Sequence, residues 1–284
     1  MRLQCFWEIQ MNFTRHFCLA AGMLAACLAA TGAYAQVDAT IGGTVDASKF
    51  STRYGLSSAS TANLTFVSDP AGSGRTVLMT RVKSTDANVG AIKRTDFYPL
   101  NESRTTGMRW YGISVYIPST WVVHPNPTVI AQIDNGTTAT NLAAPLSLLV
   151  RGNALEMNLN SNYLSATSAT VSNSTKEVIK LGPLVTNRWY CLVVRSDWQP
   201  TLGSGAITMW MNGEKVYNAS NSTNSYFGAA HTPRTGLMFP GLMGVTERTL
   251  YTDFIRLGGA STTALQMYQV SPCANFIGGN AIQW

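Results

Sequence analysis

One stretch of the chain, residues 187–217, constrains the fold more than any other. Its sequence is NRWYCLVVRSDWQPTLGSGAITMWMNGEKVY. In residues 189–194 both alternating faces of a period-two segment are apolar, so both should be buried, as in the inner layer of a sandwich. Residues 207–211 alternate again, and Asn212-Gly213 has the residue types of a two-residue hairpin turn. The stretch therefore predicts two or three neighbouring antiparallel strands around which the rest is built.

The remaining sequence has the pattern of short strands separated by turns. No apolar pattern of helical period extends over ten or more residues, which argues against long amphipathic helices. The expected strands cover residues 76–83, 91–100, 109–117, 128–133, 146–150, 155–159, 178–181 and 249–257, with an alternating segment within 55–69. Strands at regular spacing without helices predict an all-β fold, a two-sheet antiparallel sandwich of the jelly-roll type.

The first 35 residues are predicted to be a signal peptide. Met11 begins a short basic segment, Phe17–Ala30 is almost wholly apolar and too short to span a bilayer, and Ala33-Tyr34-Ala35 fits a cleavage site. Residues 36–284 are then one domain, expected to be secreted or periplasmic. An alternative interpretation is that Leu24-Ala25-Ala26-Cys27 is a lipobox, in which case Cys27 would be acylated and would anchor the chain to a membrane.

Three of the five cysteines lie in this leader, which leaves Cys191 and Cys273. An even number of cysteines in an exported chain predicts one disulfide bond, which would join the C-terminal tail to the central strands. The alternative is two buried free thiols. A metal site is not predicted, because it needs more ligands than two cysteines and neither has a histidine nearby in sequence.

Composition narrows the choice of partners. The chain is 45% hydrophobic and 12% charged, which excludes a disordered or coiled-coil protein. Its formal net charge is +6, and without the leader 18 basic and 13 acidic residues leave +5. This mild excess favours an anionic substrate. The basic residues form no run and no RNA-binding motif, so nucleic acid is not an expected partner.

Several segments, in order, resemble strands of the heparin lyase I-like polysaccharide lyases. They are residues 94–97 (RTDF), 110–118 (WYGISVYIP), 129–133 (VIAQI), the central stretch, and 251–258 (YTDFIRLG). That family shares a concanavalin A-like jelly roll with the glucuronan lyase and alginate lyase 7 families, so the resemblance implies this fold over roughly residues 93–258. It also implies a lyase that cleaves a 4-linked polyuronate by β-elimination, with no metal or other cofactor.

Such a reaction removes the C5 proton next to a carboxylate, whose charge must be neutralised by nearby donors. A histidine or tyrosine takes the proton, and a tyrosine gives one to the leaving oxygen. The resemblance places Arg94 and Gln132 at the family positions that neutralise the carboxylate, on strands expected to lie side by side on the concave sheet.

This chain departs from the family pattern at both proton-transfer positions. Asp134 stands where the family has histidine, and Met238 stands where it has tyrosine, in a segment where Arg234 takes the place of the family lysine. From their positions, His231, in a polar loop, is the candidate base and Tyr226 or Tyr98 the candidate acid. The expected catalytic residues are therefore Arg94, Gln132, Tyr226 and His231, and the expected substrate-binding residues are Tyr98, Asp134, Asn158 and Arg234.

Two other classes of function are compatible with the sequence. A non-catalytic, lectin-like carbohydrate-binding domain would explain the missing histidine and tyrosine. A glycoside hydrolase of the same sandwich class needs paired carboxylates, but the acidic residues here are scattered and form no such cluster. The expected assembly is a monomer acting on an anionic polysaccharide. The sequence does not determine which uronate is cut, or whether attack is endo or exo.

Overall fold

The computed structural model describes residues 50–100, 106–136, 142–165, 168–269 and 272–276, and the predicted leader lies outside these ranges. The described residues belong to one compact unit, Val37–Trp284. They form the strands β1 (Tyr54–Ser58), β2 (Leu64–Ser68), β3 (Thr76–Lys83), β4 (Lys93–Pro99), β5 (Gly107–Ile117), β6 (Thr128–Asp134), β7 (Leu146–Arg151), β8 (Ala154–Ser161), β9 (Thr175–Pro183), β10 (Arg188–Trp198), β11 (Gly205–Met211), β12 (Glu214–Ser222), β13 (Thr232–Phe239) and β14 (Glu247–Gly258). The helical elements are short: α2 (Phe50–Arg53), η2 (Thr61–Asn63), α3 (Ala264–Tyr268) and η3 (Cys273–Phe276).

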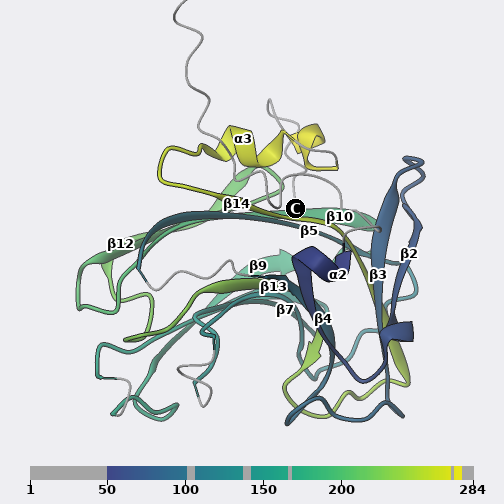
Figure 1. Cartoon of the computed structure of the whole chain (residues 1–284), viewed down its shortest axis with the longest axis horizontal. Coiled ribbons are helices and arrows are strands. Elements are labelled where there is room, and N and C mark those ends of the chain that lie inside the picture. The colour runs from purple at the N-terminus through teal and green to yellow at the C-terminus, as the bar shows by residue number, and fades with distance from the viewer. Residues whose placement is uncertain (1–49, 101–105, 137–141, 166–167, 270–271, 277–284) are drawn as a thin grey trace, which may run out of the picture. The chain divides into compact units, whose positions relative to one another are not determined.

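The strands form two antiparallel seven-stranded sheets. One has the order β1-β4-β13-β6-β7-β8-β9 and the other the order β12-β11-β10-β5-β14-β3-β2. In Figure 1 the two sheets are stacked and bend in the same direction. The first sheet is curved, and its concave side faces away from the core. We call this side of the sheet the concave face. The all-β sandwich predicted from the sequence is confirmed.

The central stretch occupies the position that its pattern predicts. On β10, Tyr190, Leu192 and Val194 point into the main core between the sheets. The alternate residues Cys191 and Val193 belong to a second buried cluster on the outer side of the same sheet. Both faces of β10 are therefore buried, because the C-terminal segment covers the outer one.

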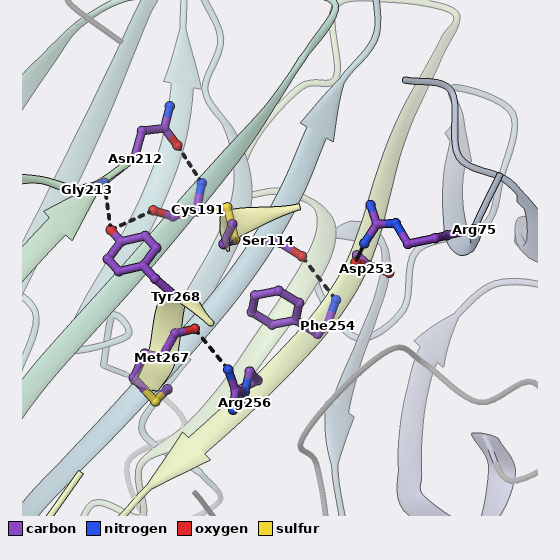
Figure 2. The surroundings of a disulfide bond; sticks show 11 residues. Arg75, Ser114, Cys191, Asn212, Gly213, Asp253, Phe254, Arg256, Met267 and Tyr268 are labelled. Atoms are coloured by element: carbon purple, nitrogen blue, oxygen red, sulfur yellow. Dashed lines mark hydrogen bonds and ion pairs between the residues drawn. A yellow bond between two sulfur atoms is a disulfide. The ribbon is translucent and has the colours of Figure 1, made fainter. Parts of the chain in front are cut away.

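A disulfide bond between Cys191 and Cys273 attaches the C-terminal segment to this outer face, as predicted. Figure 2 shows that Tyr268, at the end of α3, reaches the same place, where its hydroxyl accepts a hydrogen bond from the Gly213 N–H at 3.0 Å. A guanidinium N–H of Arg256 donates to the Gln266 carbonyl oxygen at 2.8 Å. In Figure 1, α3 lies over β5, β10 and β14.

One strand was not predicted from the sequence. β13 lies between β4 and β6 and pairs with both. Arg94 on β4 and Gln132 on β6 are therefore not on neighbouring strands, which corrects the expected arrangement. Pro233 and Gly236 interrupt the alternating pattern of residues 232–239, so this strand lacks the usual sequence signal.

Candidate active site

A row of side chains crosses the concave face from strand to strand. Arg234 of β13 is in register with Gln132 of β6, Gln132 with Ser147 of β7, and Ser147 with Asn158 of β8. Their sequence neighbours Thr235, Ile133, Leu148 and Met157 are buried, and the last three belong to the main core. Because side chains alternate along a strand, the row faces the opposite side, away from the core. We call these four residues the polar row.

A pocket of about 360 Å³ opens beside this row. Gln132, Ser147 and Asn158 line it together with the polar or charged residues Arg151, Asn160, Ser174, Lys176 and Tyr226. Part of the wall is apolar and is formed by residues such as Pro127, Val129, Leu149 and Pro240. Its volume and mixed lining are typical of a site for a small ligand or for a few units of a polymer.

Tyr226 is the most buried group of this pocket with an acidic proton. Its side chain is only 1% exposed, and burial raises the pKa of its hydroxyl to about 12. Ser174 is close enough to lower that pKa in part, yet the phenol oxygen has no partner with hydrogen-bond geometry among the described residues. The side-chain oxygen of Asn158 also lacks one. Buried polar atoms without partners are costly, so a polar ligand that supplies partners gains binding energy here.

Four alternating charges form a cluster at one end of the polar row. Asp96 is fully buried; one of its oxygens accepts a hydrogen bond from Arg94 Nε, and the other lies 3.0 Å from an Nη atom of Arg234. The Nε atom of Arg234 lies 2.8 Å from Asp134 Oδ2, although this N–H does not point at its partner as in a hydrogen bond. The two positive and two negative charges cancel, so the cluster holds side chains in place more than it attracts anions.

The electrostatics of Arg94 follow from this cluster. Burial lowers the pKa of its guanidinium, but the hydrogen bond and charge of Asp96, with Asp134 and Tyr98, outweigh that effect and raise the pKa. Arg94 therefore stays charged, and its charge is already paired. Tyr98 lies beside it under Arg234, whose guanidinium carbon is 4.0 Å from the ring centre.

His231 is placed differently from the prediction. The sequence places it in a polar loop, but its ring is fully buried and stacks on Trp198, with 4.1 Å between ring centres. Its Nε2 atom lies 2.6 Å from Ser225 Oγ. His231 does not line the pocket. The polar sequence around it gave no sign of burial, because the partner ring comes from a strand more than 30 residues earlier. A base at this position would have to leave its stack to reach a substrate.

Three predicted residues come together in the pocket: Gln132, Asn158 and Tyr226. Three others, Arg94, Asp134 and Arg234, belong to the charged cluster beside it, and Tyr98 lies under Arg234. The sequence reasoning missed Ser147, Asn160, Ser174 and Lys176. The sequence signal for these residues was the polar side of β8 and of its neighbouring strands. Only the register of the sheet shows that the polar sides of these strands line one pocket.

No group of three His, Cys, Asp or Glu side chains in the described ranges is arranged to hold a metal ion. None of the helices in the described part of the chain has the length and apolar character needed to cross a membrane.

The fold and the pocket together define a jelly-roll protein with a polar site on its concave sheet. Comparison with protein families identifies the class more narrowly: the family described as "Polysaccharide lyase" matches residues 33–256. This match spans most of the chain, and the protein therefore belongs to the polysaccharide lyase family. No curated protein matches the chain in a sequence search.

Solved structures of lyases share the fold. An endo-β-1,4-glucuronan lyase from the fungus Trichoderma reesei superposes with a TM-score of 0.57 at 17% identity, over 72% of this chain and 88% of that one. An alginate lyase from a Chlorella virus gives 0.54 at 10% identity, over 77% and 99%. A family 7 alginate lyase in complex with its product gives 0.50 at 12% identity, over 73% and 95%. At these identities the likeness shows the fold alone.

Proposed function

We propose that the protein is an exported polysaccharide lyase that cleaves a 4-linked polyuronate of the glucuronan or alginate type by β-elimination. The observation that carries the proposal is the pocket in which the amides of Gln132 and Asn158 meet the buried phenol of Tyr226. Family membership supports the reaction class. The net positive charge of the chain suits an anionic polymer.

The amides suit the first requirement of the reaction. Abstraction of the C5 proton places negative charge on the neighbouring carboxylate, and donors fixed before the reaction stabilise that charge. Gln132 is the central candidate, because it is in register with both Arg234 and Ser147 and faces the pocket. Arg234, held by Asp96 and Asp134, acts as a positioning residue at its side.

Proton transfer falls to residues other than those of the family pattern. The raised pKa of Tyr226 keeps its hydroxyl protonated, as a donor to the leaving oxygen must be. Neither His124 nor His231, the histidines of the described ranges, lines the pocket. Two candidates for the acceptor of the C5 proton lie close to the polar row. One is the carboxylate of Asp134, and the other is the phenolate form of Tyr226.

The test is incubation of the purified protein with glucuronan, alginate, heparin and pectate, followed by the ultraviolet absorbance of the unsaturated product. We expect absorbance to rise with glucuronan or alginate, and to stay flat with Tyr226→Phe, which keeps the ring and loses the acidic proton. A protein that binds one of these polymers but never produces the absorbance would be the lectin-like alternative. No binding and no cleavage of any of the four would rule out the proposal.

A further inference from the structure

One basic residue of the pocket has no place in the reaction described above. Lys176 lies on the edge strand β9, in register with Asn160 of β8, and lines the same pocket as Gln132 and Tyr226. It is exposed, whereas the guanidinium groups of the charged cluster are largely covered.

Lys176 also differs from its basic neighbours in having no charge partner. Arg94 and Arg234 pair with Asp96, and Arg151 lies 3.0 Å from Glu156. Throughout the described ranges, Lys176 is in no ion pair. The adjacent Glu177 is engaged elsewhere, since it accepts a hydrogen bond from the Tyr217 hydroxyl at 2.7 Å. The positive charge of this pocket that is available to a ligand is therefore concentrated at its β9 side.

The spacing of the strands separates Lys176 from the reacting sugar. Between Gln132 on β6 and Lys176 on β9 lie the strands β7 and β8. Neighbouring strands are about 4.8 Å apart, so the two backbones are on the order of 14 Å apart across the sheet. One carboxylate held at Gln132 is too small to reach both side chains. A 1,4-linked pyranose unit advances its polymer by about the spacing of neighbouring strands, so a polymer crossing the sheet brings a different carboxylate to Lys176.

We propose that Lys176 binds the carboxylate of a uronate unit other than the one that is cleaved, as part of a subsite at the β9 edge. The inference rests on the proposed function, because it takes the polymer to be a polyuronate lying across the polar row. A contact so far from the reacting bond contributes equally to the ground state and the transition state. It therefore lowers KM on long substrates and leaves kcat little changed.

The experiment compares wild type, Lys176→Ala and Lys176→Arg on alginate and glucuronan oligomers of three and of six units. We expect Lys176→Ala to raise KM for the six-unit substrate about tenfold, which corresponds to the loss of one charge-assisted contact. The rise in KM for the three-unit substrate should be smaller. Lys176→Arg should keep most of the affinity. Lys215→Ala is the matched control, because Lys215 is an exposed lysine on the edge strand β12 of the other sheet and should leave both constants unchanged.

A second readout separates this inference from the proposed function. In the Tyr226→Phe background, the Kd for the six-unit oligomer is measured at low and at high salt. The affinity should fall with salt, and fall less steeply once Lys176 is replaced by alanine. If the wild type cleaves the oligomers and Lys176→Ala has the same KM and salt dependence, the subsite is wrong and the lyase proposal stands. If the wild type neither binds nor cleaves them, both are wrong.

Discussion

At the scale of single residues, Gln132 carries the strongest prediction. Gln132→Ala removes an amide from the centre of the polar row without disturbing the core, because the side chain faces the pocket. Loss of one positioned donor costs about 3 kcal/mol of transition-state stabilisation, or about a hundredfold in rate. We expect kcat to fall by that factor with a smaller change in KM, and the melting temperature to stay near that of the wild type. An unchanged kcat would remove Gln132 from the reaction.

Mutation of Asp134 and the pH dependence of kcat/KM together distinguish the two candidates for the catalytic base. If Asp134 accepts the proton, Asp134→Asn should abolish activity at every pH, because an amide cannot take the proton. If the phenolate of Tyr226 accepts it, activity should keep rising into the alkaline range, since burial places that pKa at about 12. Asp134→Asn keeps the size of the side chain, so a lost rate would report the lost carboxylate and not a change of shape. Activity of Asp134→Asn equal to that of the wild type excludes the first route.

At the scale of elements, β13 positions Arg234, and one glycine allows β13 to lie against β4. Gly236 has a φ of +135°, and a Cβ there would lie 2.3 Å from the Thr95 carbonyl oxygen. Gly236→Ala must therefore move backbone, which costs about 2–3 kcal/mol or more. For a domain of this size the melting temperature should fall by about 5–10 °C.

Gly241→Ala is the control for this prediction, because Gly241 has open space around it and no left-handed φ. Its melting temperature should match that of the wild type within about 2 °C. Equal melting temperatures for both alanine variants would show that β13 tolerates a Cβ at residue 236 and would contradict the close approach described above.

The same elements show what the sequence allows one to predict. The hairpin between β11 and β12 was predictable because Asn212 and Gly213 both take positive φ, 51° and 85°, as their residue types indicate. The burial of β10 on both faces followed from its apolar run. By contrast, β13 has too little alternation to be recognised alone, and its place between β4 and β6 depends on pairing with strands about 140 and about 100 residues away. The burial of His231 was not predictable for the same reason, since the ring that stacks on it, Trp198, comes from another strand.

At the scale of the whole molecule, a buried ion network links the β2–β3 loop to β14. Arg75 pairs with both Asp69 and Asp253, and Asp253 is fully buried in the sheet whose outer side Figure 2 shows. Burial raises the pKa of Asp253 to about 6, with Arg75 offsetting only part of the effect. The hydrogen bonds and charge around Asp69 outweigh its own burial and lower its pKa. The two carboxylates therefore affect stability in different pH ranges.

Because its pKa is raised, Asp253 stabilises the folded protein at low pH and not at high pH. The folded protein holds this proton more tightly than the unfolded chain, so the contribution stabilises the fold below about pH 4 and is lost as the pH rises through about 6. A shift of about two units corresponds to on the order of 2–3 kcal/mol. Asp253→Asn keeps the shape and cannot ionise. The wild type should therefore lose free energy of unfolding relative to this variant by that amount between pH 4 and pH 7.5.

Denaturant unfolding of both proteins across this pH range measures the difference, and the contribution of Asp69 cancels because both proteins contain it. Arg75 keeps its pair with Asp69 in the variant, so the guanidinium is not left without a carboxylate. A difference that stays constant with pH would mean that Asp253 has an ordinary pKa in the folded protein. A difference that changes in the opposite direction would mean that Arg75 outweighs the burial of Asp253, which makes the ion pair a net source of stability at neutral pH.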